Sequence, residues 1–293
     1  QHALLPETTR DFGAARVSLL LKPCGHVGGD LVGMFSPGHG TLAFYCLDVS
    51  GHGITSAMMT ARVAGYLSHA HPEHNLALER RYERYFALHP PETVARRLND
   101  RLSHDEAVEA YFTMTYATFD MDTGRMRFVQ AGHPPPLILR ADGRHEFVGD
   151  GGLPVGLLPG AKYQSGTVDL LPGDRVLLYS DGFTECLCRN GDMLGESGLV
   201  RLAAACDPIS GGPEFLDDLY WRLTLERDAG IAMEDDVSAA LLEFGPRDAR
   251  SQPRSTARSP GLPSTPAASS AGIQSATWPG SVGGPSGRTG RAT

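Results

Sequence analysis

Four aspartates stand at the ends of apolar segments in this sequence of 293 residues. They are Asp30 before residues 31–35, Asp48 after residues 42–47, Asp181 after residues 176–180, and Asp236 before residues 237–244. A carboxylate beside an apolar core loses hydration, which is unfavourable unless hydrogen bonds or cations compensate. One such aspartate is commonly a turn residue, as Asp181 before Gly182 would be. Four of them favour a shared site.

Converging carboxylates without lysine or arginine between them repel one another unless a cation binds there. Oxygen ligands without thiolates favour Mg²⁺ or Mn²⁺ over zinc. The stretch Asp48-Val49-Ser50-Gly51-His52-Gly53 places two glycines between a strand end and an expected helix start. Such a turn lets the backbone approach an ion closely, and a helix N-terminus favours anions. A metal ion and a phosphate group could therefore meet at this turn.

The cysteines predict neither a disulfide framework nor a zinc site. Their number is odd, and they are Cys24, Cys46, Cys186, Cys188 and Cys206. Cys186 and Cys188 could form half of a zinc site, but no second Cys or His pair stands at ligand spacing. We therefore expect ordinary thiols.

The elements that must position the aspartates follow from hydrophobic periodicity. We expect strands at 15–22, 31–35, 42–47, 111–119, 125–130, 136–140, 145–148, 167–170, 175–180 and 237–244. We expect helices at 54–69, from Pro91 to about residue 103, at 197–205 and at 214–227. The first helix should bury a stripe of Ile54, Ala57, Met58, Ala61, Ala64 and Leu67. Runs of strands interrupted by paired helices predict a layered α+β fold with largely antiparallel sheets.

Charge and composition divide the chain and exclude several classes of protein. The formal net charge is −8, but residues 246–293 carry +5, so residues 1–245 carry −13. An acidic body argues against nucleic-acid binding. The sequence contains no run of 18 apolar residues that could span a membrane, and the start at Gln1 lacks a secretory signal. We therefore expect a cytoplasmic protein. Residues 246–293 contain 23 Ser, Pro and Gly, which predicts a disordered tail.

Six motifs in register carry a resemblance to a known family. They are Gly28-Gly29-Asp30, Asp48 to Gly53, Ala131-Gly132-His133-Pro134-Pro135-Pro136, Gly152-Leu153-Pro154-Val155-Gly156, Ser180-Asp181-Gly182 and Asp235-Asp236-Val237-Ser238. In this order the chain resembles the metal-dependent protein phosphatases of the PPM type, in the bacterial SpoIIE-like branch, over roughly residues 4–244. The resemblance implies a four-layer αββα sandwich, in which two mainly antiparallel sheets are flanked by helix pairs and a two-metal site lies at one end.

The resemblance also implies roles for individual residues. Asp48 would bridge both metals, and Val49 would offer its backbone carbonyl. Asp30 would serve one metal, and Asp181 and Asp236 would hold the other. Successive side chains on a strand point to opposite faces, so only one of Asp235 and Asp236 can easily face the metals, and we favour Asp236.

Four other residues could take part in the chemistry. His52 could donate a proton to the leaving oxygen, or it could be a local hydrogen-bonding residue beside a glycine turn. His133, followed by three prolines, is expected to be a structural turn element. Animal-type members of the family bind substrate phosphate with an arginine near the N-terminus, and Arg10 and Arg16 lie in that region without matching a motif.

The function implied is that of a protein serine/threonine phosphatase. Two Mn²⁺ or Mg²⁺ ions would lower the pKa of a bridging water, and the resulting hydroxide would attack phosphorus in line with the leaving oxygen. The substrate would be phosphoserine or phosphothreonine on a regulatory protein such as an anti-sigma-factor antagonist. Two alternatives remain: a non-catalytic module of the same fold that binds a regulatory partner, and a metal-dependent hydrolase of small phosphate esters.

The domain organisation follows from these expectations. Residues 1–11 would be the end of a linker from an upstream sensor or receiver domain, residues 12–245 the phosphatase domain, and residues 246–293 the tail.

Overall fold

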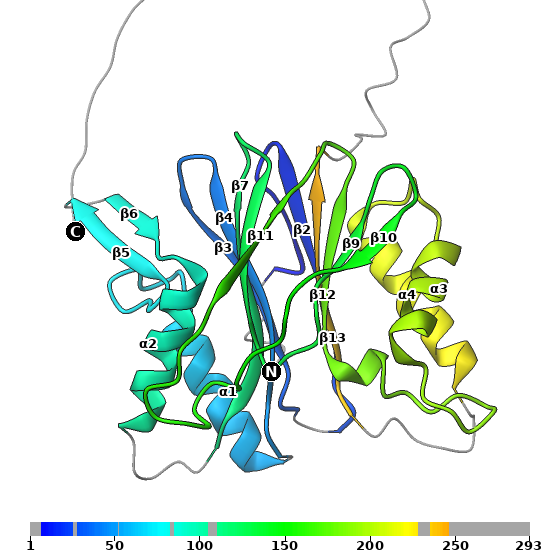
Figure 1. The fold of residues 1–293 in the computed structure, drawn as a ribbon, viewed down its shortest axis with the longest axis horizontal. Coiled ribbons are helices and arrows are strands. Elements are labelled where there is room, and N and C mark those ends of the chain that lie inside the picture. Colours follow the sequence, from blue (N-terminus) through cyan, green and yellow to red (C-terminus); the bar gives the residue numbers. More distant parts are fainter. Residues whose placement is uncertain are drawn as a thin grey trace, which may run out of the picture. The chain divides into compact units, whose positions relative to one another are not determined.

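Two antiparallel sheets, packed face to face, form the centre of the fold (Figure 1). The computed structural model describes residues 7–25, 28–51, 53–82, 85–104, 110–227 and 235–245. The six-stranded sheet has the order β1 (Thr9–Asp11), β2 (Ala15–Lys22), β13 (Val237–Phe244), β12 (Arg175–Tyr179), β9 (Leu137–Leu139) and β10 (His145–Phe147). The five-stranded sheet has the order β11 (Ser165–Asp169), β8 (Arg125–Ala131), β7 (Phe112–Asp120), β4 (Thr41–Val49) and β3 (Leu31–Gly38).

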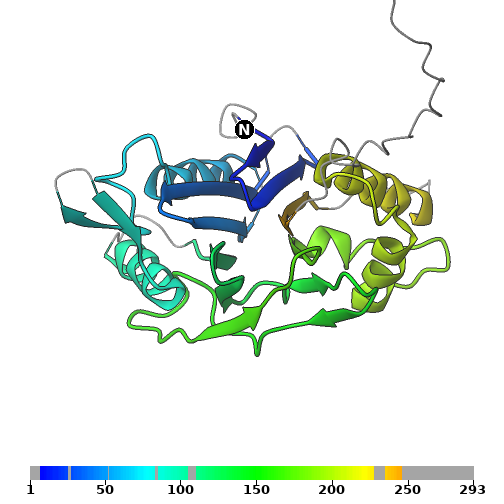
Figure 2. The same cartoon turned by 90° about the horizontal axis from the view of Figure 1, so that it is seen from above.

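Helix pairs cover the outer faces of both sheets, so that four layers follow one another when the fold is seen from above (Figure 2). Helices α1 (Ile54–Tyr66) and α2 (Pro91–Ser103) lie against the five-stranded sheet. Helices α3 (Gly195–Ala205) and α4 (Gly212–Glu226) lie against the six-stranded sheet. The α+β fold with four αββα layers, predicted from the sequence, is confirmed.

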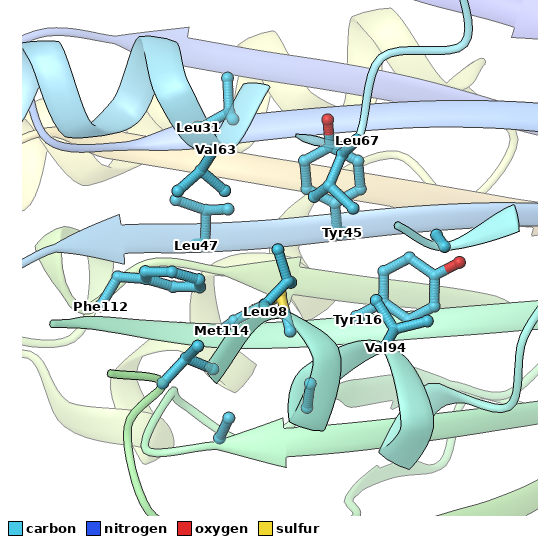
Figure 3. Close-up of a cluster of buried hydrophobic side chains, with 14 of the residues drawn as sticks. Leu31, Tyr45, Leu47, Val63, Leu67, Val94, Leu98, Phe112, Met114 and Tyr116 are labelled. Carbon is cyan, nitrogen blue, oxygen red and sulfur yellow. The ribbon is translucent and has the colours of Figure 1, made fainter. Parts of the chain in front are cut away.

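Alternation along the strands sorts the core into three buried clusters. In β4, Phe44 and Cys46 face the other sheet, whereas Tyr45 and Leu47 face the helices. The second pair belongs to the cluster between the five-stranded sheet and α1 and α2, which includes Val63 from α1 (Figure 3). Because β4 is buried on both faces, its apolar run has no polar alternation, as the sequence predicted.

The predicted buried stripe of α1 is wrong at its start, although Leu67 at its end is buried as predicted. Ile54 and Met58 are 77% and 70% exposed, and the helix instead buries Ser56, Met59, Thr60 and Val63. Burial of the two hydroxyls is possible because each donates a hydrogen bond to a backbone carbonyl. The buried stripe of α1 is therefore partly polar, which hydrophobic periodicity does not detect. The helix ends at Tyr66, earlier than the expected residue 69.

Two further segments differ from expectation. A hairpin of β5 (Leu78–Tyr82) and β6 (Tyr85–Leu88) lies in the polar stretch 71–90, for which the sequence predicts no helix or strand. Residues 9–11, which we placed at the end of a linker, pair with β2 and belong to the six-stranded sheet. Within the described residues, no helix is long and apolar enough to cross a membrane. His52 and the tail 246–293 lie outside the described residues.

Candidate active site

The aspartates predicted from the sequence meet at one end of the space between the two sheets. Asp48 shares the face of β4 that carries Phe44 and Cys46, so its side chain points between the sheets. Asp30 and Asp236 directly precede β3 and β13 and have the same phase as the inward-facing Val32 and Ala240. Leu31 pairs with Leu47, which places Asp30 beside the end of β4. The ends of β3, β4 and β13 therefore bring three carboxylates close together.

Hydrogen bonds join the loop before β3 to the other sheet. The Asp236 carboxylate accepts a bond from the Cys24 amide at 2.8 Å and another from the Asp30 amide at 3.3 Å. The Val49 amide donates to the Gly29 carbonyl at 3.3 Å. Asp236 is therefore oriented by backbone groups, and the loop lies against the end of β4.

The glycine pair at 28 and 29 makes this close approach possible. A Cβ on Gly28 would lie 1.6 Å from Oδ2 of Asp236. A Cβ on Gly29 would lie 2.8 Å from the Val49 carbonyl oxygen and 3.0 Å from Oδ1 of Asp48. Any larger residue would fill the space into which these oxygens point, so both glycines are required by contact with the site.

Asp181 reaches the site from the end of β12. It begins a short 3₁₀ turn, Asp181–Phe183, and a Cβ on Gly182 would lie 2.0 Å from the carbonyl oxygen of Asp236. The turn is thus packed tightly against the start of β13. Asp235 is exposed, whereas Asp236 is 5% exposed, and Oδ1 of Asp235 accepts a bond from the Asp236 amide at 2.8 Å.

The carboxylates of the site oppose one another's ionisation. Burial, followed by repulsion from Asp181 and Asp235, raises the pKa of Asp48 to about 7. Burial and then Asp235 raise the pKa of Asp181 to about 6. Burial and then Asp48 raise the pKa of Asp30 well above its ordinary value. None of the main causes of these shifts is a lysine or arginine, so repulsion between carboxylates outweighs attraction by basic side chains at the site.

The donor set fits a hard cation by its chemistry, because it offers carboxylate oxygens and the Val49 carbonyl and no thiolate. Because Gly28 and Gly29 have no side chains, the space beside these oxygens stays open. No three His, Cys, Asp or Glu side chains of the described residues lie close enough to hold an ion as they stand. The described residues thus supply the chemistry of a hard-cation site without a preformed set of three such side chains around one point.

The comparison with known families agrees with this geometry. Residues 38–245 match the family described as Stage II sporulation protein E (SpoIIE). The chain belongs to the SpoIIE family. The resemblance to the SpoIIE-like branch of the PPM-type phosphatases, seen in the six sequence motifs, is thereby confirmed.

Two relatives of this SpoIIE-family chain are named phosphoserine phosphatases of Bacillus subtilis. RsbP is 28% identical over 154 residues, which are 53% of this chain and 36% of RsbP. RsbU is 27% identical over 196 residues, which are 67% of this chain and 53% of RsbU. The SpoIIE-family chain thus spans between about a third and about half of the length of these relatives.

Solved structures share the fold. The PP2C domain of SiaA from Pseudomonas aeruginosa has a TM-score of 0.65 at 17% identity and covers 78% of this SpoIIE-family chain and 85% of that domain. RsbX in complex with magnesium has a TM-score of 0.56 at 12% identity and covers 80% of this chain and 98% of RsbX. At these identities the likeness concerns the fold.

The arginines considered for substrate phosphate lie away from the carboxylates. Arg16 is in register with Glu243, near the opposite end of β13 from Asp236, and its guanidinium pairs with Asp11 at 3.2 Å. Arg10 lies 3.9 Å from Glu7. Lys22 is the register partner of Val237 and so stands at the site end of β2, with Nζ 5.4 Å from the ring centroid of Tyr220. The structure does not bring Arg10 or Arg16 to the site.

Sequence reasoning missed two polar residues that contact this end of the sandwich. Thr60 of α1 donates a hydrogen bond to the Gly29 carbonyl, and Thr113 of β7 bonds His133. A threonine on a helix or strand carries no sequence signal for such a contact.

Proposed function

We propose that this chain is a metal-dependent protein serine/threonine phosphatase, acting on phosphoserine or phosphothreonine in a regulatory protein. The observation that carries the proposal is the convergence of Asp30, Asp48, Asp181 and Asp236 at one end of the sandwich, from strands of both sheets. Uncompensated carboxylates in a buried setting favour a cation. The names of RsbP and RsbU support the choice of substrate chemistry.

In this proposal the chain holds two Mn²⁺ or Mg²⁺ ions. Asp48 serves both, the Val49 carbonyl and Asp30 add ligands, and Asp181 and Asp236 complete the set. When bound, such ions activate a water molecule and neutralise phosphoryl oxygens. The amides of Cys24 and Asp30 hold the Asp236 carboxylate in place, which lowers the cost of arranging it for binding. His52 is proposed as the donor of the proton that the leaving serine or threonine oxygen requires.

The partners are also proposed. A phosphorylated anti-sigma-factor antagonist is the kind of substrate we favour, and an upstream sensor or receiver domain is the kind of regulator. The part of the relatives that this chain does not span leaves room for such a domain in them.

The same fold could serve as a non-catalytic module that binds a regulatory partner. Loss of ligands would be expected in a vestigial site, because nothing would then offset the cost of burying carboxylates. Here Asp30 and Asp236 are 1% and 5% exposed and all four aspartates are present, which favours the enzyme.

The test is hydrolysis of a phosphoserine peptide by the full chain with and without added Mn²⁺ or Mg²⁺. We expect phosphate release that depends on the metal and stops with a chelator. Nucleotides and small phosphate esters are the comparison substrates, since preference for them would favour a metal-dependent hydrolase of small phosphate esters. Undiminished phosphopeptide hydrolysis after exhaustive chelation would contradict the metal-dependent mechanism.

A further inference from the structure

A buried histidine to which the proposed function gives no role lies at the same end of the sandwich. His133 follows β8 and is 3% exposed. Gln130 fixes its backbone by donating to the His133 carbonyl at 2.7 Å, and Thr115 donates to the Pro134 carbonyl at 3.3 Å. The turn is therefore held from two strands of the five-stranded sheet, and the ring has little freedom.

The imidazole of His133 contacts β7, the strand that pairs with β4 at Asp48. Its Nδ1 lies 2.8 Å from the hydroxyl of Thr113 in β7. In the pairing of β4 with β7, Thr113 is the partner of Asp48. The two residues also share the face that points between the sheets. His133 thus contacts Thr113, which stands beside Asp48 in the five-stranded sheet.

The other side of the ring faces the six-stranded sheet. Burial lowers the pKa of His133 to about 3, and the backbone carbonyl of Tyr179 opposes this shift. Tyr179 ends β12, two residues before Asp181. The buried Nε2 makes no regular hydrogen bond to the described residues. A neutral ring carries one N–H, so a Thr113 hydroxyl that donates to Nδ1 leaves the hydrogen on Nε2, which the backbone of Tyr179 favours without a regular hydrogen bond.

We propose that His133 is a positioning residue, which links Thr113 beside Asp48 to Tyr179 before Asp181 and so sets the distance between the two halves of the metal site. The inference rests on the proposed function. Its importance follows from the geometry, because Asp48 and Asp181 come from different sheets and would have to reach one ion together. Groups that orient metal ligands commonly contribute to metal affinity without touching the metal.

A purely structural histidine would fill the same space and leave metal affinity alone. Three variants separate the two roles. His133→Ala removes the ring, His133→Asn keeps a polar atom near the position of Nδ1 but does not reach Tyr179, and Thr113→Val removes the hydroxyl while keeping the shape. Leu242→Val is the matched control, because Leu242 is fully buried in the core between the sheets, six residues along β13 from Asp236.

The experiment is calorimetric titration of the full chain with Mn²⁺, with urea unfolding in chelator as the measure of stability. We expect His133→Ala and Thr113→Val to raise the Mn²⁺ dissociation constant by about tenfold or more. His133→Asn should fall between His133→Ala and the wild type. The double variant His133→Ala with Thr113→Val should be less than additive, since both changes break one contact. Leu242→Val should lose stability with Mn²⁺ affinity unchanged.

Equal Mn²⁺ affinity in the wild type, His133→Asn and Thr113→Val would overturn the proposal, even if all variants were less stable. His133→Asn and Thr113→Val keep the test decisive if His133→Ala fails to fold. A folded wild type that binds no Mn²⁺ would overturn the proposed function itself, and a wild type that binds while the variants bind equally well would overturn only the role of His133.

Discussion

The hydroxyl of Thr60 on α1 donates a hydrogen bond of 2.8 Å to the carbonyl oxygen of Gly29. The Ser56 carbonyl lies 2.9 Å from the same hydroxyl, so the two carbonyls share one hydrogen. Gly29 precedes Asp30, and a Cβ added to Gly29 would lie 3.0 Å from Oδ1 of Asp48. Helix α1 is thus connected to the carboxylate site through the Thr60 side chain.

Thr60→Val should weaken this connection without changing the shape of the buried face. The lost hydrogen bond should lower the free energy of unfolding by about 1 kcal/mol. The Gly29 loop should then be held less firmly, so the Mn²⁺ concentration for half-maximal phosphopeptide hydrolysis should rise. Urea unfolding and metal titration of activity measure the two effects.

Thr60→Ser is the control that keeps the hydroxyl, and it should restore the metal dependence of the wild type. Thr55→Val is the control for the substitution itself, because Thr55 is exposed on the same helix. If Thr60→Val lost stability but kept the metal dependence of the wild type, α1 would not be coupled to the site through this contact.

Gly28→Ala should damage the site more than the small change in size suggests. The added methyl would lie 1.6 Å from Oδ2 of Asp236, so the carboxylate must move or the loop must shift. We expect phosphopeptide hydrolysis to fall by more than about tenfold, a barrier increase of about 1.4 kcal/mol. Gly25→Ala is the matched control in the same segment, since no other described residue comes within 4 Å of a Cβ added there. Comparable activity of Gly28→Ala and Gly25→Ala would show that hydrolysis does not depend on the position of the Asp236 carboxylate.

Much of the site was predictable because strand alternation is a local property. Asp48 continues the inward phase of Phe44 and Cys46, and Asp236 has the phase of Ala240. An aspartate at the end of a buried strand can therefore be assigned to the space between the sheets before the fold is known. The layered α+β fold followed from the same periodicity.

The rest depends on contacts between segments that are distant in the sequence. The buried face of α1 follows the hydrogen-bond partners of Ser56 and Thr60, which sequence periodicity does not reveal. The contact between His133 and Thr113 forms only when β7 and the turn after β8 meet. The β5–β6 hairpin was missed because its strands are polar or half-buried and lack a regular apolar alternation.

Asp48→Ala should be the most harmful single ligand change if Asp48 serves both ions. Asp181→Ala and Asp236→Ala would each remove a ligand from one ion. Asp236→Ala also removes the acceptor of two backbone amides, so it should lose stability, whereas Asp48→Ala relieves repulsion and should not. Steady-state hydrolysis ranks the variants by activity, and unfolding in chelator ranks them by stability. Asp217→Ala, an exposed change on α4, is the control.

Activity of Asp48→Ala within about tenfold of the wild type would contradict its assignment as the shared ligand. A larger stability loss for Asp48→Ala than for Asp236→Ala in chelator would contradict the account of repulsion.

The metal-free protein should become more stable as the pH falls from neutrality. The pKa of Asp48 is about 7 and that of Asp181 about 6 in the folded state, and that of Asp30 is also raised. In the unfolded chain an aspartate has a pKa of about 3.9. Between these values the folded protein retains protons that the unfolded chain has released, so stability is highest at the acidic side of the window and is lost as the pH rises through the folded pKa values.

His133 acts in the opposite direction, because its folded pKa of about 3 lies below its ordinary value and the unfolded state takes up its proton first. Burial also lowers the pKa of the partly buried His89, which acts in the same direction as His133, and the two histidines should offset only part of the effect of three aspartates. Melting temperatures in chelator, from about pH 8 to about pH 5, should therefore rise as the pH falls, and Asp48→Asn should show a shallower rise. Bound Mn²⁺ needs the carboxylates ionised, so the stabilisation by added Mn²⁺ should grow as the pH rises. A wild type whose melting temperature in chelator increases with pH over this range, or an Asp48→Asn variant with the wild-type slope, would show that these carboxyls are not the buried, mutually repelling groups that the structure describes.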